Sequence, residues 1–119
     1  MEFYRFDKDN GKKITHFNSD FIMSRIIQTN SKANIGCMHL GESGIVGYHQ
    51  AVVPQLLLVV DGEGYVRNEE DTYHYVKSGD AVFWQKDEWH ETKTVEGMLV
   101  IVIESEELDP SLFMKLANI

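Results

Sequence analysis

Short runs of β-forming residues alternate with turn-forming residues along this chain, and that alternation restricts the fold more than any other feature. Glycine, asparagine, aspartate and serine occupy most of the gaps, as in Asp61-Gly62 and Ser78-Gly79-Asp80. Many short strands joined by frequent turns are typical of an all-β sandwich or barrel. The predicted strands cover residues 2–6, 21–29, 33–40, 46–53, 55–61, 64–68, 72–76, 81–85, 90–94 and 98–104.

The C-terminal end has a different pattern. Asp109 is a candidate N-cap, Pro110 follows at the first helical position, and Leu112, Phe113 and Leu116 would share one face. We therefore expect one short helix over about residues 110–118, packed on the barrel. The length of 119 residues fits a single domain, so residues 1–119 are assigned to one unit.

The charge distribution disfavours two classes of partner. The formal net charge is −8, and the nearest approach to a basic run is Lys12-Lys13, so we expect neither a nucleic-acid partner nor an anionic membrane partner. Cys37 is the single cysteine, the N-terminus lacks the apolar core of a signal peptide, and the apolar run 56–60 is too short to span a bilayer. These features predict a cytoplasmic protein.

Two segments, 44–64 and 79–94, contain the residues with ligand chemistry. His49 lies on one predicted strand, Gln55 opens the next after a bend at Pro54, and His90 opens a later one. Because a barrel brings remote strand ends together inside one mouth, these three side chains are candidates for a common pocket.

The two segments resemble the paired motifs of the cupin superfamily, over about residues 33–104. His49, Gly79 and His90 match motif positions, Gly62 lies close to the closing Gly of the first motif, and Gln55 stands at its Glu position. The resemblance implies a cupin barrel, that is, a double-stranded β-helix or jelly roll. It also implies a homodimer, since small cupins often pair.

Several motif positions differ from the family pattern. Ala51 replaces the second His, Gln55 replaces Glu, Gln85 replaces Pro, Asp87 replaces Gly and Thr94 replaces Asn. In metal-bearing cupins three His and the Glu hold a divalent ion. The resemblance thus implies a reduced metal triad of His49, Gln55 and His90, for Zn, Ni, Fe or Mn, with lower affinity than a full four-ligand site.

Each candidate also has a simpler interpretation. His49 and His90 could be pocket histidines bonded to each other or to water, and Gln55 could orient a histidine or a ligand instead of binding metal. His39 could fill the place left by Ala51, although a partly buried structural histidine is the simpler reading. The remaining candidate pocket-lining residues are Trp84, for which core packing is the default, and Trp89, a candidate pocket lip.

Three functional hypotheses follow. The first is a metal-dependent enzyme, such as a dioxygenase or isomerase, acting on a small-molecule substrate, although no general base with a placed partner is visible. The second is a non-catalytic small-molecule binding barrel, resembling the sugar- or effector-sensing domain of AraC-type regulators. The third is a role in assembly, with the strand-rich N-terminus adding to a partner's sheet edge. Whether the chain is an enzyme stays open at this point.

Overall fold

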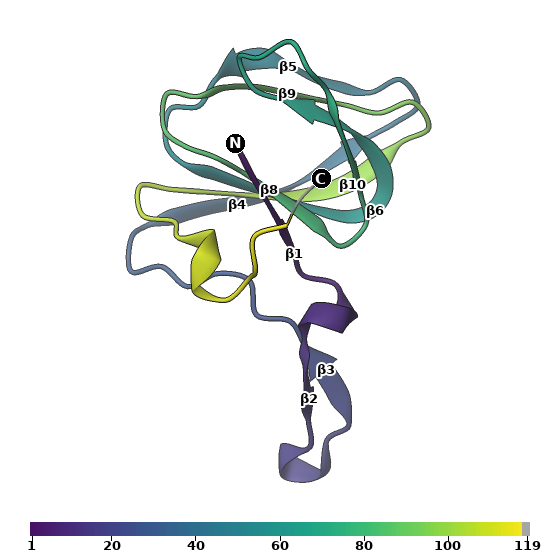
Figure 1. Ribbon diagram of the computed structural model, residues 1–119, viewed down its shortest axis with the longest axis vertical. Helices are drawn as coiled ribbons and strands as arrows, with labels where there is room; N and C mark the ends of the chain where they lie inside the picture. The colour runs from purple at the N-terminus through teal and green to yellow at the C-terminus, as the bar shows by residue number, and fades with distance from the viewer. Residues whose placement is uncertain (118–119) are drawn as a thin grey trace.

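The larger wall of the barrel is a five-stranded antiparallel sheet, seen in a computed structural model that describes residues 1–117 (Figure 1). Its strands run in the order β1-β8-β6-β10-β4. Their bounds are β1 Glu2–Arg5, β4 Ala33–Leu40, β6 Gln55–Arg67, β8 Asp80–Trp84 and β10 Met98–Ser105. Except at β6, these bounds lie within about a residue of the predicted strands.

The smaller wall contains β5 (Ile45–Gln50), β9 (Trp89–Lys93), the second half of β6, and β7 (His74–Lys77). The sequence predicted two strands, 55–61 and 64–68, where the structure has the single thirteen-residue β6. Gly62 lies at the junction with a φ of 83°, and a Cβ there would collide with the carbonyl oxygen of Gly97. The predicted turn is therefore a bend that passes β6 from one wall to the other.

Apolar side chains fill the space between the walls, and a second apolar layer covers the outside of the larger wall. The interior cluster contains Phe3, Leu57, Val59, Val66, Val76, Val82, Trp84, Met98 and Val100. On the outer face Leu56, Leu58, Phe83 and Ile103 pack with residues from the chain ends, among them Tyr4 and Met114. Alternation along β6 explains both layers: Leu56–Val59 are buried, whereas Val60, the last residue of the apolar run, is 40% exposed.

A hairpin projects from the barrel (Figure 1), formed by β2 (Lys12–Ile14) and β3 (Phe21–Met23). The sequence predicted one long strand over 21–29 and missed β2. Short 3₁₀ turns, η1 (Lys8–Asn10) and η2 (His16–Asn18), lie at the start of the hairpin and at its tip.

The helix predicted over 110–118 is wrong in type and length. Asp109 does cap a turn, its carboxylate accepting from the Ser111 amide at 3.0 Å, but the turn is the 3₁₀ segment η3, Pro110–Leu112. The chain then extends beside β1, where Leu116 bridges Tyr4. Residue 118 of the predicted helix lies outside the described residues. Within residues 1–117, the helices are all too short to cross a membrane.

Candidate functional site

The imidazoles of His49 and His90 face each other inside one end of the barrel. β5 and β9 are antiparallel neighbours, and the two histidines are paired directly across them. Their ring centroids lie 4.3 Å apart, with the planes inclined at 51°. His90 is only 2% exposed, whereas His49 is open to solvent. The structure therefore brings together two imidazoles that lie far apart in the sequence, one of them accessible from outside.

The ring nitrogens of this pair differ in their partners. His49 Nδ1 lies 2.6 Å from the carbonyl oxygen of Gly47, so Nδ1 donates the hydrogen bond and Nε2 keeps its lone pair. His90 Nε2 is buried and has no hydrogen-bond partner in the described part of the chain. A carbonyl that fixes the far nitrogen of a histidine is the usual support of a ligating imidazole.

Burial keeps the inner histidine neutral. The pKa of His90 is lowered from 6.5 to about 4, chiefly by burial and in smaller part by repulsion from His49, while Glu88 acts in the opposite direction. His90 is thus an uncharged imidazole near pH 7, which is the form that binds metal ions or accepts a hydrogen bond.

Trp84 lies beside His90, and Gln55 is the cross-strand neighbour of Trp84. The Trp84 ring is fully buried, with its centroid 4.6 Å from that of His90, and its Nε1 also lacks a hydrogen-bond partner among residues 1–117. Gln55 is paired directly across β6 and β8 from Trp84, and alternation puts its buried side chain on the same face as the interior residue Leu57. Trp84 thus has His90 on one side and Gln55 opposite it in the sheet.

His39 does not join this group. It is paired with Leu99 on β10, whereas Gln55 is paired with Glu104, five residues further along the same strand. At about 3.3 Å per residue, that separation is roughly 17 Å. His39 is also exposed, while its neighbour Met38 packs against the interior cluster. The place left by Ala51 is therefore not filled by His39.

Trp89 faces away from the histidine pair. It stacks on Tyr48 with ring centroids 5.2 Å apart, and it is adjacent to the inward-facing His90 on β9. Since neighbouring side chains on a strand point to opposite faces, this stack lies on the outside of the smaller wall. Cys37, the single cysteine, is exposed on β4.

The sequence interpretation missed a polar network beside that stack. The Arg67 guanidinium lies 4.2 Å from the centre of the Tyr48 ring and pairs with Glu91 at 3.1 Å, and the Tyr73 hydroxyl donates to the same carboxylate. The Tyr73 hydrogen bond, followed by Arg67, holds the pKa of Glu91 below its usual value. Alternation along 89–93 already implied an outward Glu91, but its partners come from other strands.

Glu88, which directly precedes β9, is engaged by other residues. Its oxygens accept from the amino group of Met1 at 2.6 Å, from the Gln85 amide at 3.0 Å and from Asn68 Nδ2 at 3.0 Å. Across residues 1–117, no three His, Cys, Asp or Glu side chains cluster so as to hold a metal ion. A metal at this site would therefore rest on two imidazoles and a neutral oxygen.

Comparison with known proteins gives matches only at the level of structure. No family model and no curated protein matches the chain. KdgF from Halomonas sp. superposes with a TM-score of 0.59 at 22% identity, covering 70% of this chain and 78% of that one. An RmlC-like cupin from Shewanella frigidimarina has a TM-score of 0.59 at 19% identity, with coverages of 66% and 70%. A cupin superfamily protein from Desulfitobacterium hafniense has a TM-score of 0.59 at 14% identity, with coverages of 67% and 72%. This chain therefore has the cupin fold that its motifs predicted.

Proposed function

We propose that this protein is a small cupin that binds a divalent transition metal ion through Nε2 of His49 and Nε2 of His90, with the amide oxygen of Gln55 as third ligand. The metal would in turn hold a small-molecule ligand or substrate. The observation that carries the proposal is the facing pair of imidazoles, since the Gly47 carbonyl leaves one Nε2 free and the other Nε2 is buried without a partner.

The donor set fits some metals better than others. Neutral imidazole suits Zn, Ni and Fe, and Mn accepts mixed nitrogen and oxygen ligands, whereas Ca and Mg prefer several anionic oxygens. An amide oxygen contributes a dipole where a carboxylate would contribute a full charge, so the affinity should be moderate. Three protein ligands would leave coordination positions open to a small molecule.

The residues around the pair would prepare it for ligands. The Gly47 carbonyl orients His49, and Trp84 and the interior cluster keep water away from the inner side of His90. A bound metal would supply Lewis-acid polarisation of a ligand oxygen. Glu88 is engaged by three donors, and Glu91 lies on the outer face, so neither is placed as a general base. A dioxygenase- or isomerase-like activity would therefore have to work without either carboxylate.

One observation favours a second candidate, a metal-free small-molecule binding barrel. Trp84 Nε1 and His90 Nε2 are buried polar atoms on rings whose centroids lie 4.6 Å apart, and neither has a hydrogen-bond partner among the residues described. Buried polar groups are normally hydrogen-bonded, so a ligand oxygen that met both would remove two unfavourable groups at once. This role is that of a sensor or carrier without catalysis.

Calorimetric titration with zinc or nickel tests the first proposal. The protein should be free of affinity tags and treated with a chelator beforehand. We expect about one ion per chain, with affinity falling at least about tenfold, or 1.4 kcal/mol, in His49→Ala and in His90→Ala. His39→Ala is the matched control, because that histidine is outside the site.

Unchanged affinity in both site variants would contradict the metal proposal. The second candidate is then tested on the metal-free protein by thermal melting with a panel of sugars and aromatic acids. It predicts that a ligand raises the melting temperature of the native protein and that Trp84→Phe removes most of this rise. A panel without any stabilising compound would contradict it.

A further inference from the structure

The projecting hairpin, here called the arm (residues 12–23), carries an unusual amount of exposed apolar surface for so small an element. Phe17 at its tip is 98% exposed, and Phe21, Ile22 and Met23 on β3 are each between 44% and 48% exposed. β2 and β3 form a separate two-stranded sheet and, in the described residues, pair only with each other. An isolated two-stranded hairpin is marginally stable in water, so an arm of this kind gains from a surface that covers it.

The tip presents its aromatic ring in a strained backbone conformation. Phe17 and its neighbour Asn18 both have left-handed backbone angles, with φ of 57° and 59°. Asparagine adopts this region readily, whereas a bulky residue such as phenylalanine does so at a cost. Phe17 is thus held away from the barrel by a local conformation that its own side chain disfavours.

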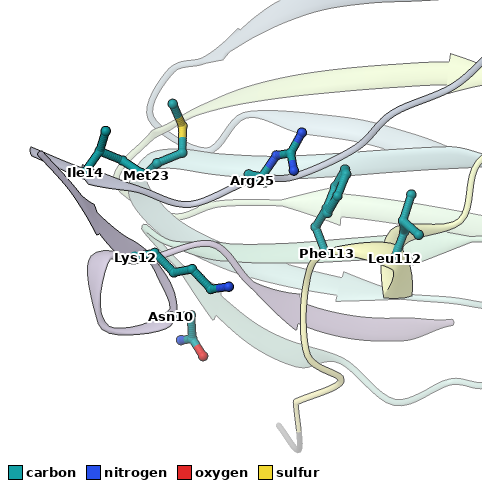
Figure 2. A pocket seen from close by; sticks show the side chains of 7 residues that line it. All are labelled: Asn10, Lys12, Ile14, Met23, Arg25, Leu112 and Phe113. Carbon is teal, nitrogen blue, oxygen red and sulfur yellow. The ribbon is translucent and has the colours of Figure 1, made fainter. Parts of the chain in front are cut away.

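A groove at the base of the same arm has walls suited to an aromatic side chain such as Phe17 (Figure 2). It is a pocket of about 410 Å³ between the arm and η3. Its lining residues are Asn10, Lys12, Ile14, Met23, Arg25, Leu112 and Phe113. The guanidinium of Arg25 lies 4.4 Å from the centre of the Phe113 ring. The groove therefore combines aliphatic and aromatic walls with two cationic side chains.

We propose that the groove receives Phe17 from the arm of a second copy of this chain, and that each copy does the same to the other. Tip and groove lie on the same arm, about five residues or roughly 17 Å apart along β2. If two arms lie side by side and antiparallel, related by a two-fold axis, the tip of each arm therefore reaches the groove of the other. Such a contact closes on itself and forms a dimer without further growth.

Charge supports a second copy as the occupant. Asp20, beside the tip, is exposed, and its only ion pair is with exposed Lys13 on the opposite strand at 3.3 Å, in the part of the chain that the structure describes. In the proposed dimer this carboxylate approaches Lys12 and Arg25 of the other groove. The chains carry a net charge of −8 each and repel overall, so these opposite charges favour this orientation over others.

The oligomeric state of a single-residue variant tests this arrangement. Sedimentation equilibrium over a concentration series should give a dimer for the native chain, and at least a tenfold higher dissociation constant for Phe17→Ser. The fold should persist, because Phe17 makes almost no contact with the barrel. Val52→Ser is the matched control, since that side chain is 77% exposed and lies outside the arm. A monomeric native chain, or an unchanged dimer in Phe17→Ser, would overturn the proposal.

A cross-link tests the tip-to-groove pairing itself. Phe17→Cys and Leu112→Cys chains, both with Cys37→Ser and one with a tag that shifts its mass, are mixed under oxidised glutathione. We expect a disulfide-linked heterodimer, and none when Val52→Cys replaces Leu112→Cys. If the native chain is a dimer that gives no such link, its interface lies elsewhere, for example at the free edge of β4, and the arm exchange is wrong.

Discussion

His49 and His90 face each other only because β5 contains an irregularity just before His49. Val46 is paired with Thr92, so a regular ladder would pair Tyr48 with His90 and turn His49 to the outside. The register instead shifts between Val46 and His49, which places one extra residue in β5. This bulge turns His49 inward and leaves Tyr48 stacked on Trp89 on the outer face. The candidate site and the outer aromatic stack therefore have the same structural origin.

Acid should destabilise the metal-free protein through His90. Its pKa is about 4 in the folded state and about 6.5 when unfolded, so as pH falls through 6.5 the unfolded chain takes up a proton that the folded chain does not. This loss accumulates down to about pH 4 and amounts to roughly 3 kcal/mol. Urea denaturation of chelator-treated protein at several pH values measures it. His90→Gln should flatten the dependence and the exposed control His16→Gln should not; equal slopes in native and His90→Gln proteins would refute the assignment.

Introducing the motif's carboxylate at position 55 should raise metal affinity and lower the stability of the metal-free protein. Gln55→Glu adds an anionic oxygen to the proposed ligand set, and we expect zinc affinity to rise by about tenfold or more. In the metal-free protein the same change buries an unpaired carboxylate and should lower the free energy of unfolding by about 1–3 kcal/mol. Gln55→Met keeps the length without the oxygen and should weaken zinc binding. Identical affinities for Gln, Glu and Met would remove position 55 from the site.

Trp84 should report metal binding by its fluorescence. Its ring lies 4.6 Å from that of His90, whereas Trp89 is on the other face of the smaller wall. A quenching ion such as Ni²⁺ or Cu²⁺ should therefore reduce the emission of the native protein and of Trp89→Phe by similar absolute amounts. In Trp84→Phe the remaining emission should change little. Quenching that persists in Trp84→Phe and vanishes in Trp89→Phe would place the ion outside the barrel.

The Arg67–Glu91 pair should contribute to stability and not to ligand binding. Arg67→Met leaves the Glu91 carboxylate without its cation and should lower the free energy of unfolding more than the loss of an exposed pair does. Lys13→Met, which breaks an exposed pair with Asp20, should cost at most about 1 kcal/mol. Zinc affinity should stay the same in both variants. A large loss of affinity in Arg67→Met would show that the outer network supports the site.

The walls of the barrel were predictable because alternation and turns are local signals. β4 has the predicted bounds, and four of the five residues of the apolar run 56–60 are buried, Val60 being the exposed one. The two histidines could be assigned to one region through the motif resemblance. Alternation also places Trp89 and His90 on opposite faces, which the interpretation of Trp89 as a pocket lip did not use.

Features that depend on distant partners were not predictable from the residues alone. The bulge before His49 is fixed by pairing with β9; Gly47 inside β5 is a local sign of an irregular strand, but it does not give the register. Asp109 caps the element as predicted, but the predicted helix is only the turn η3, because Ala117 donates to the Phe3 carbonyl at 2.7 Å and the chain follows β1. Tertiary pairing overrides helix propensity there.

X-ray absorption at the zinc edge is the decisive measurement for the proposed metal site, because it counts the imidazoles bound to the ion. For zinc-loaded native protein the account predicts two imidazole ligands at about 2.0–2.1 Å, with oxygen completing the shell. His49→Ala and His90→Ala should each show one imidazole at most, and His39→Ala should still show two. A native spectrum without imidazole, or one that neither site variant changes, would contradict the account.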